Sequence, residues 1–351
     1  MKKVIVGLSG GVDSAVTAAL LKKEGYEVIG ATLVQCDSSE FAANDAAKVA
    51  DELHISHTIA DVRDDFQNLI ETPFKNAYLS GRTPNPCVAC NRLVKFKTLL
   101  RLADEMGADF IATGHYAKII SDNGAYFVSK AKDAAKDQSY MLYQLSQKEL
   151  SRAIFPLGNF TKSEVRNMAK TFGISVASKK DSEDICFIPS GDYISYITDH
   201  QKNLPPIGNF VNESGNILGQ HEGIYRYTVG QRKGLKIALG KPAYVKSINA
   251  EKNEVVLADD EDLYEEKIFA GELYFPHIPP TDGEEFSAVV KIRYHHKGTP
   301  AKIIKSNDTL EISFVEPVRA RQEDRRRCCT TIKARYWAED IFYNAIRGIC
   351  G

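Results

Sequence analysis

The sequence predicts an α/β chain that opens with a doubly wound parallel sheet and continues into a small central β-rich domain and a C-terminal β-barrel. Apolar segments alternate with helical ones over residues 1–120, a pattern typical of strands covered by helices on both faces. The texture changes after Pro205-Pro206, and prolines mark a second change near 276–280. The 351 residues, 43% of them hydrophobic, suffice for two or three packed cores. We therefore predict domains at 1–202, 203–270 and 271–351.

Four strands and two helices between them make up the expected parallel sheet. The strands are predicted at 3–8, 27–33, 57–62 and 110–113, and the helices at 40–53 and 92–106. Right-handed crossovers would make this sheet Rossmann-like, with ligands at the carboxyl ends of the strands. The loops that begin at Ser9 and Thr113 each follow a strand, so we expect them to share one site.

The remaining elements are predicted from turns and periodicity. Residues 138–178 are expected to be mainly helical. Glycine-rich turns then separate short strands at 208–211, 244–248 and 254–257, which indicates the central β-rich domain. Strands at 285–293 and 309–315 indicate the last β domain.

The bulk composition bounds the class of protein. The net charge of -1 means that an RNA-binding surface would have to concentrate its cations on one face. No apolar run approaches the length of a membrane span, and Met1-Lys2-Lys3 leads directly into a strand instead of a secretory signal. With seven cysteines and no targeting segment, we expect reduced thiols and a cytoplasmic location.

The segment Leu8-Ser9-Gly10-Gly11-Val12-Asp13-Ser14 indicates a phosphate site. It lies between the first strand and a helical stretch. Two glycines allow a sharp turn with amides facing inward, and the helix start adds N–H groups with a partial positive charge. Such a turn cradles phosphate or pyrophosphate, and Asp13 is a candidate ligand for Mg²⁺. It is not a Walker A loop, because no Gly-Lys-Ser/Thr follows at the required spacing.

Three cysteines are candidates for thiol chemistry. Cys87 and Cys90 follow a rigid turn with two prolines and precede a helix, whose N-terminus lowers the pKa of a thiol. Cys186 is close in sequence to Lys179 and Lys180, whose charges would favour a thiolate. A zinc site at Cys87 and Cys90 would need a second CxxC or a His pair, and the chain has no second CxxC. Cys36 is interpreted as a small core residue.

A series of motifs occurs in one order along the chain: SGGVDS at 9–14, GRTPNPCVACN at 81–91, TGHY at 113–116, KDQSYMLY at 136–143 and DSEDICF at 181–187. GIYRYTVGQRKGL at 223–235 and KIRY at 291–294 follow. Together they closely resemble the tRNA-specific 2-thiouridylase family, whose SGGxDS segment is a pyrophosphatase loop on a domain of the adenine-nucleotide α-hydrolase type. The resemblance covers residues 1–320.

The resemblance implies thiolation of tRNA. Family members replace the C2 oxygen of the wobble uridine with sulfur. ATP first adenylates that oxygen, because an amide oxygen is a poor leaving group, and pyrophosphate is released. A cysteine persulfide then delivers sulfur and AMP departs, and a second thiol resolves the disulfide by thiol exchange. The implied cofactors are ATP and Mg²⁺, and the implied partners are the anticodon arm of tRNA and a cysteine desulfurase or sulfur-relay protein.

The motif positions imply a role for each matching residue. Cys90 would be the nucleophile that ends the cycle, and Cys186 would carry the persulfide. The residues that would cradle ATP are Gly7, Leu8, Ser9, Gly10, Gly11, Val12, Asp13 and Ser14, with Leu33 and Gly114 near the adenine and ribose. The residues that would contact tRNA are Asn85, Pro86, Cys87, His115, Lys136, Asp137, Gln138, Arg293 and Tyr294, among which cations suit phosphates and an aromatic ring suits an unpaired base.

Cys87 departs from many relatives, which carry an acidic residue at this position. Together with Cys90 and Cys186 it makes three thiolates that could hold an iron–sulfur cluster with one open site. In that alternative, hydrosulfide on the open iron attacks the activated base and no persulfide forms. We favour the persulfide route and keep the cluster as the alternative.

The resemblance ends at Glu316-Pro317-Val318-Arg319-Ala320. The following residues are highly charged and include Cys328-Cys329 and the only Trp of the chain. One codon choice, read two nucleotides later, yields an apolar run, an Asn-Lys-Gly turn and a second apolar run, a pattern typical of a hairpin. We therefore hypothesise a frameshift near residue 321. Cys328, Cys329 and Cys350 would then carry no function, and the last β domain would lack its closing strands and expose unpaired edges.

Two other functions explain part of the pattern. A different pyrophosphatase-loop enzyme, an amide- or amidine-forming ligase, accounts for SGGVDS but leaves Cys90 and Cys186 without roles. A non-catalytic RNA-binding protein accounts for the basic and aromatic stretch 225–233 but leaves the ATP loop unexplained. ATP consumption and a requirement for both cysteines discriminate among the three.

Overall fold

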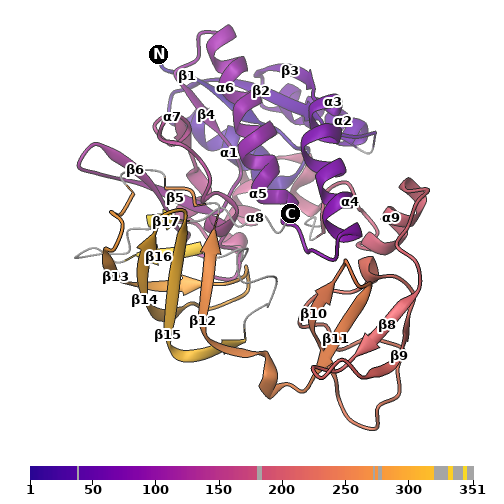
Figure 1. Cartoon of the computed structure of the whole chain (residues 1–351). Coiled ribbons are helices and arrows are strands. Elements are labelled where there is room, and N and C mark those ends of the chain that lie inside the picture. The colour runs from indigo at the N-terminus through magenta and orange to yellow at the C-terminus, as the bar shows by residue number, and fades with distance from the viewer. Residues whose placement is uncertain are drawn as a thin grey trace. The chain divides into compact units, whose positions relative to one another are not determined.

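The structure, a computed structural model, describes residues 1–37, 39–179, 184–271, 273–275 and 279–319, together with the backbone of 331–334 and 343–345. The described residues form two compact units. Figure 1 labels their helices and strands. The first comprises Met1–Ile70 and Cys87–Phe187, and the second comprises Glu71–Pro86 and the described residues from Ile188 onward. The chain therefore enters the second unit twice. The boundaries of the three predicted domains stay predictions.

The first unit is built on a five-stranded parallel sheet with strand order β3-β2-β1-β4-β7. The predicted strands are confirmed within one or two residues, and the short edge strand β7 was not predicted. Val4, Ile5 and Val6 of β1 are fully buried, as expected for a strand covered on both faces. The strands are β1 (Lys3–Gly7), β2 (Glu27–Val34), β3 (Ser56–Asp61), β4 (Phe110–Ala112) and β7 (Ala153–Ile154).

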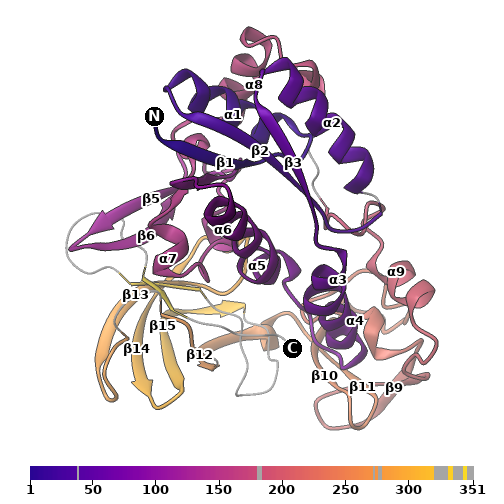
Figure 2. The same cartoon turned by 90° about the horizontal axis from the view of Figure 1, so that it is seen from above.

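Helices cover both faces of this sheet. Figure 2 shows α1 (Val12–Lys23) and α2 (Ser39–Glu52) on one face and α6 (Phe96–Glu105) on the other. Ala18 and Leu21 of α1 pack with Val4 and Val6 in one apolar cluster, to which α2 adds Ala46. The predicted helix at 40–53 is α2. The predicted helix at 92–106 is a π-helical turn (Asn91–Lys95) that continues into α6.

Shorter elements complete the first unit. Residues 138–178 are less helical than predicted, because short 3₁₀ turns and strand β7 interrupt them. Helix α8 begins with a capping box, in which Thr161 and Glu164 satisfy each other's backbone N–H groups. The elements are α3 (Arg63–Phe66), a π-helical turn (Gln67–Glu71) that leads out of the unit, α5 (Pro86–Cys90), β5 (Ala117–Asp122), β6 (Ala125–Lys130), α7 (Gln147–Leu150), α8 (Lys162–Thr171) and 3₁₀ turns at Ser139–Met141, Pro156–Asn159 and Ser175–Ser178.

The second unit begins with a pair of helices and a four-stranded sheet. The rings of Tyr78 in α4 (Thr72–Leu79) and Tyr193 in α9 (Tyr193–His200) stack with centroids 4.3 Å apart. The sheet has the order β10-β11-β8-β9 and encloses a core that includes Phe210, Val245 and Val255. The predicted strands are confirmed as β8 (Gly208–Val211), β10 (Tyr244–Asn249) and β11 (Glu254–Ala258), and β9 (Ile217–His221) joins them, with a 3₁₀ turn at Ile224–Arg226.

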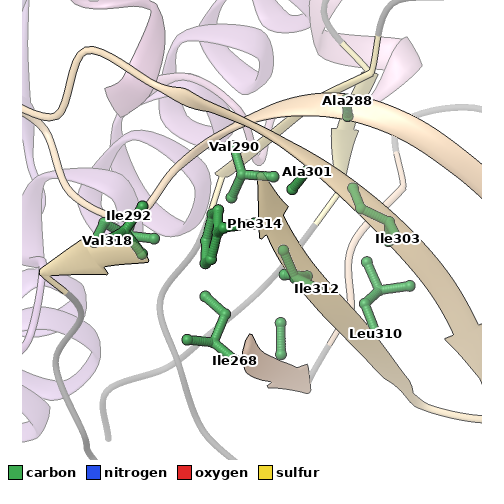
Figure 3. Packing of buried hydrophobic residues seen from close by; sticks show 11 residues of the cluster. Ile268, Ala288, Val290, Ile292, Ala301, Ile303, Leu310, Ile312, Phe314 and Val318 are labelled. Atoms are coloured by element: carbon green, nitrogen blue, oxygen red, sulfur yellow. The ribbon is translucent and has the colours of Figure 1, made fainter. Parts of the chain in front are cut away.

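The predicted C-terminal β domain is a six-stranded antiparallel sheet with the order β12-β15-β14-β13-β16-β17. Its apolar face gathers around Phe314, with Val290, Ile303 and Ile312 among the buried side chains (Figure 3). Alternating burial along β15 is the pattern of a strand with one covered face. The strands are β12 (Tyr264–Gly271, after a 3₁₀ turn at Glu261–Leu263), β13 (Glu285–Lys291), β14 (Thr299–Ser306), β15 (Thr309–Arg319), β16 (Thr331–Ala334) and β17 (Tyr343–Ala345).

Most of the atypical tail, including Cys328, Cys329 and Cys350, lies outside the described residues, and the frameshift hypothesis stays a prediction. Two backbone segments of the tail are described. β16 pairs antiparallel with β13, and β17 pairs with β16. We expected unpaired edges in the last β domain, but the edge of β13 is paired in this structure. No helix among the described residues has the length and apolar character that a bilayer span requires.

Candidate active site

The strand order of the first unit defines where a ligand binds. The chain runs outward from β1 to β2 and β3, then returns to β4 on the other side of β1. In such sheets the ligand crevice lies beyond the carboxyl ends of the two strands that flank the reversal. Here these are β1, which leads into Ser9, and β4, which leads into Thr113.

The loop after β1 is folded by its own hydrogen bonds. The backbone N–H of Ser9 donates to Ser14 Oγ at 3.1 Å, and Ser14 Oγ donates to the carbonyl oxygen of Gly11 at 3.1 Å. Gly10 has a φ of +66°, and a Cβ there would lie 2.5 Å from the carbonyl oxygen of Ala42. Only glycine fits this turn. Gly11 is the N-cap of α1 and provides no side-chain cap, so the first turn of the helix presents its amides as a phosphate site does.

The loop after β4 meets this turn, as predicted. A Cβ on Gly114 would lie 2.8 Å from both the carbonyl carbon of Asp13 and the amide nitrogen of Ser14. Beside Gly114, the ring of His115 stacks on Phe96, and its Nδ1 is 2.7 Å from Thr113 Oγ1. Burial lowers the pKa of His115 well below its usual value. His115 is therefore neutral at pH 7 and would bring no positive charge to the tRNA contact expected of it.

Asp13 is engaged by a lysine and a tyrosine. Lys162 Nζ donates to both carboxylate oxygens of Asp13 at 2.8 Å, and Tyr116 Oη donates to Oδ1 at 2.9 Å. The Lys162 side chain is only 12% exposed. A second lysine, Lys179, donates to the carbonyl oxygen of Gly10 at 2.9 Å and to Asp45 at 2.8 Å, and this hydrogen bond holds the pKa of Asp45 below its usual value.

The arrangement of Asp13 does not fit the predicted Mg²⁺ ligand. Both of its carboxylate oxygens are taken by an ammonium group, whereas Mg²⁺ needs free oxygen ligands. What the loop offers to a triphosphate is a set of backbone amides, with two lysines beside it: Lys162, which is paired with Asp13, and Lys179, which is bound to Gly10 and Asp45. The predicted nucleotide residue Leu33 lies near the end of β2, next to the strand that carries this loop.

Cys90 and Cys186 meet at one side chain that the sequence did not single out. Gln35 Nε2 donates to Cys90 Sγ at 3.8 Å, and Cys186 Sγ donates to Gln35 Oε1 at 3.8 Å. Gln35 follows the last residue of β2, so it lies at the carboxyl edge of the sheet where the nucleotide loop also lies. In the sequence, Cys90 is 55 residues from Gln35 and Cys186 is 151 residues from it. The fold thus brings together the two cysteines that the sequence assigned to one reaction.

The prediction that these cysteines favour the thiolate is wrong. Burial, and to a smaller extent the neighbouring sulfur of Cys90, raises the pKa of Cys186 to about 12, although solvent reaches the side chain. Burial also raises the pKa of Cys90 and of Cys87, against the weaker opposing effect of Lys95. Lys179, expected to activate Cys186, is bound to Asp45 and Gly10 instead. Both reactive candidates are neutral thiols at pH 7.

The three cysteines proposed as cluster ligands do not form a ligand set here. Among the described residues, no group of three His, Cys, Asp or Glu side chains could hold a metal ion. The carboxamide of Gln35 lies between Cys90 and Cys186 and contacts both sulfurs. Cys36, expected in the core, is half-buried and contacts Ser39 Oγ at 3.3 Å.

The residues expected to contact tRNA fall into two groups. Asp137 accepts hydrogen bonds from Ala131 and Ser139, and Gln138 accepts one from the backbone of Tyr116, so both side chains hold their own loop. Lys136 is half-buried in the same loop, and the Cys87 side chain is exposed. Asn85, Pro86, Arg293 and Tyr294 belong to the second unit, where Arg293 is exposed and Tyr294 is half-buried after β13.

Comparisons with known proteins identify the family of the chain. The family description "tRNA methyl transferase HUP domain" matches residues 2–190, and "tRNA methyl transferase PRC-barrel domain" matches residues 195–259. The tRNA-specific 2-thiouridylase MnmA of Lachnoclostridium phytofermentans is 45% identical over 338 residues, which cover 91% of this chain and 94% of the relative. A relative of the same name from Clostridium tetani is 46% identical and covered to 91%. The chain belongs to the tRNA-specific 2-thiouridylase family.

The match to other 2-thiouridylases has a limited extent. Each of these two matches covers 91% of this chain. Among solved structures, the chain is similar to the U34-tRNA thiolase NcsA from Methanococcus maripaludis with its [4Fe-4S] cluster, at 23% identity, covering 57% of this chain and 66% of that one, with a TM-score of 0.36. It is also similar to a 4-thiouridine synthetase–RNA complex with bound ATP, at 19% identity, covering 56% and 50%, with a TM-score of 0.37.

Proposed function

We propose that this 2-thiouridylase catalyses the ATP-dependent 2-thiolation of the wobble uridine of tRNA through a cysteine persulfide. One observation carries the proposal. The phosphate-type loop Ser9–Ser14 and the pair Cys90 and Cys186 lie at the carboxyl edge of one parallel sheet, the pair on the single side chain of Gln35. An amide ligase needs the loop but not the cysteines, and an RNA-binding module needs neither.

The first step is adenylation of the base. The C2 oxygen of uridine attacks the α-phosphorus of ATP, the bond to the bridging oxygen of the β-phosphate breaks, and pyrophosphate leaves. The amides at the start of α1 and its partial positive charge stabilise the phosphates. Lys162 and Lys179 add positive charge beside the loop, which supports the charge that develops on pyrophosphate. No step depends on a metal ion at Asp13.

The second step is sulfur transfer. The terminal sulfur of a Cys186 persulfide attacks C2, and the C2–O bond breaks with release of AMP. Cys90 then loses its proton and attacks Cys186 Sγ. The bond between Cys186 Sγ and the transferred sulfur breaks, its electron pair stays on that sulfur, and 2-thiouridine leaves a Cys90–Cys186 disulfide. An external thiol reductant restores the pair. The shared contact on Gln35 supports this pairing.

The exposure of Cys186 supports delivery of sulfur from outside. Its side chain is exposed, whereas Cys90 is only 7% exposed. We therefore propose that a cysteine desulfurase or a sulfur-relay protein of the cytoplasm loads Cys186, and that the anticodon arm of tRNA brings the base to Cys90. An iron–sulfur cluster on Cys87, Cys90 and Cys186 has no comparable support from their arrangement.

The test combines tRNA, ATP, cysteine and a cysteine desulfurase with four proteins: the wild type, Cys90→Ser, Cys186→Ser and the matched control Cys36→Ser. We expect both site variants to form no 2-thiouridine but to retain tRNA-dependent exchange of pyrophosphate into ATP. Cys36→Ser should thiolate like the wild type, because the new hydroxyl still reaches Ser39. Thiolation by Cys90→Ser and Cys186→Ser, or ATP consumption with a small acceptor in place of tRNA, would contradict the proposal.

A further inference from the structure

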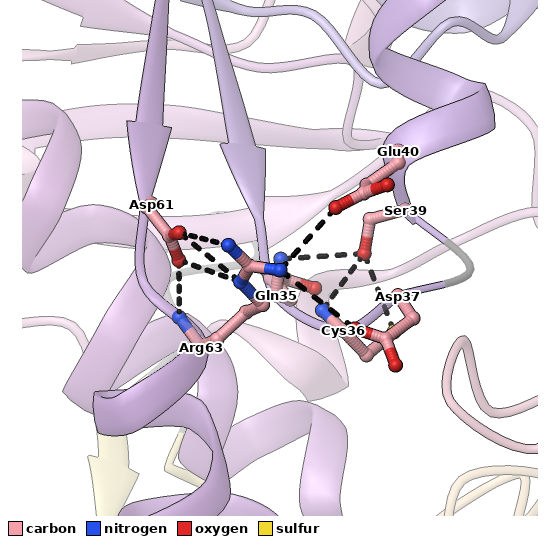
Figure 4. Close-up of polar contacts among 7 residues, drawn as sticks. All are labelled: Gln35, Cys36, Asp37, Ser39, Glu40, Asp61 and Arg63. Atoms are coloured by element: carbon pink, nitrogen blue, oxygen red, sulfur yellow. Dashed lines mark hydrogen bonds and ion pairs between the residues drawn. The ribbon is translucent and has the colours of Figure 1, made fainter.

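Gln35 lies in a hydrogen-bonded turn at the end of β2. Its backbone N–H donates to Ser39 Oγ at 3.2 Å, and the backbone N–H of Cys36 donates to the same oxygen at 3.0 Å. Figure 4 shows these bonds beside Arg63, which pairs with Asp61 and with Glu40. The start of the Gln35 side chain is therefore fixed by a strand end and two hydrogen bonds, and the contacts with the two sulfurs orient its carboxamide.

The carboxamide uses its two ends on two different sulfurs. Nε2 donates to Cys90 Sγ, and Oε1 accepts from Cys186 Sγ, both at 3.8 Å. A carboxamide offers a donor and an acceptor in one short planar group, which neither a carboxylate nor an alkyl chain does. A donor at Cys90 stabilises its thiolate, and an acceptor at Cys186 stabilises its thiol. Gln35 therefore favours ionisation of Cys90 and opposes ionisation of Cys186.

We propose that Gln35 is a positioning residue for sulfur transfer, which stabilises the reduced Cys90–Cys186 pair and favours Cys90 as the sulfur that ionises and attacks. This inference rests on the proposed function. When Cys90 attacks Cys186 Sγ, the thiolate charge on Cys90 disappears into the new S–S bond. Neither sulfur of the disulfide carries a proton to donate or a charge to attract a donor, so both contacts with Gln35 weaken. Gln35 thus stabilises the dithiol selectively and assists its regeneration.

The surroundings of the pair make such a donor useful. Burial raises the pKa of Cys90 and of Cys186, so the thiolate needs local support. The other titratable groups that act on them are Lys95, which favours the thiolates, and Cys87 and Cys36, which oppose them. Gln35 supplies a neutral donor whose effect does not itself vary with pH.

Two length-matched variants separate this role from simple space filling. Gln35→Met keeps the volume without donor or acceptor, and Gln35→Glu keeps the acceptor but adds a negative charge. Gln67→Met, at an exposed position, is the control. The measurements are the pH dependence of Cys90 alkylation by iodoacetamide, resolved by peptide mass spectrometry, the thiol–disulfide equilibrium of the pair against glutathione, and the midpoint of thermal unfolding.

In Gln35→Met, we expect the Cys90 alkylation profile to move to higher pH and the equilibrium to favour the disulfide by roughly three- to tenfold, the range that one hydrogen bond supplies. Gln35→Glu should move the Cys90 profile further, because its carboxylate repels the thiolate. The unfolding midpoint should stay that of the wild type. A Gln35→Met protein with wild-type profile and equilibrium overturns the inference. These readouts need no tRNA, so a wild-type protein that fails to thiolate tRNA would refute the proposed function separately.

Discussion

The nucleotide loop and Gln35, which contacts the cysteine pair, follow neighbouring strands, yet the loop and the pair are held in opposite ways. The loop is fixed by contacts near 3 Å: Ser9 with Ser14, Ser14 with Gly11, and Asp13 with Lys162. Within the part of the chain that the structure describes, the two sulfurs are tied through Gln35, at 3.8 Å each. A phosphate cradle works when it is preorganised. Sulfurs that must bind a donor, a base and each other in turn need weak ties. We therefore call the nucleotide loop, Ser9–Ser14 with its contacts, the rigid half of the site. We call the pair Cys90 and Cys186 the loose half.

The largest effect, on pyrophosphate exchange, is expected from a substitution of Gly114, which packs closely against the rigid half. In Gly114→Ala, the new methyl group would lie 2.8 Å from the backbone of Asp13 and Ser14, so the cradle must move. Overpacking of this kind costs about 1–3 kcal/mol, so tRNA-dependent pyrophosphate exchange should fall by up to roughly a hundredfold. The thiol–disulfide equilibrium of Cys90 and Cys186 should not change. A change in both would show that the two halves are not separate.

A tenfold effect on the KM for ATP is expected from the loss of the ion pair between Asp13 and Lys162 in the rigid half. Lys162→Met leaves the partly buried carboxylate of Asp13 without its ammonium partner, facing the phosphates. The KM for ATP should rise about tenfold and the midpoint of thermal unfolding should fall, because the loss of a charged hydrogen-bond partner by a partly buried carboxylate costs about 1–3 kcal/mol. Asp13→Asn combined with Lys162→Met should restore the midpoint. If Lys162→Met binds ATP like the wild type, the pair has no part in the cradle.

The burial of Cys186, in the loose half, should change the pH dependence of its alkylation. Since burial raises the pKa of Cys186 to about 12, its thiol stays protonated through the range in which an ordinary cysteine ionises. Alkylation of Cys186 should therefore keep rising above pH 9, where free cysteine has levelled off. The folded state holds this proton more tightly than the unfolded state, so the stability contribution present at neutral pH should decline as pH rises above 9. A plateau below pH 8 would contradict this environment.

The smallest effect is expected outside both halves. Arg101 and Glu105 form an exposed ion pair one turn apart on α6. Glu105→Gln should change the free energy of unfolding by no more than about 0.5 kcal/mol and leave both half-reactions unchanged. A larger effect on either one would show that the helix surface contributes to the site, and the comparison would need a third region.

Local sequence patterns predicted the parts of the fold that depend on local physics. The apolar run Val4-Ile5-Val6, the glycine turn after it and the alternating strand Thr309–Arg319 each carry their structure in consecutive residues. The order of strands and glycine loops then predicted that Gly114 would meet the Ser9 turn. The resemblance pointed to Cys90 and Cys186, which the structure brings to one residue.

What the sequence did not predict depends on contacts between distant residues. Gln35 has no motif of its own, and its importance follows only from its place at the end of β2. Lys162 lies 149 residues from Asp13, and that ion pair removes the expected Mg²⁺ ligand. The neighbouring lysines predicted a thiolate at Cys186, but its pKa is raised. The cause is burial, which depends on the folded chain and not on the residues next to Cys186 in the sequence.

The most direct test of the account is a single turnover. Protein loaded with persulfide on Cys186 is mixed anaerobically with ATP and one equivalent of tRNA, quenched with acid and analysed by mass spectrometry, with iron and sulfide measured on the same sample. The account predicts one Cys90–Cys186 disulfide for each 2-thiouridine, in protein without iron. Thiouridine formed without the disulfide, and only in protein that contains iron and sulfide, would contradict it.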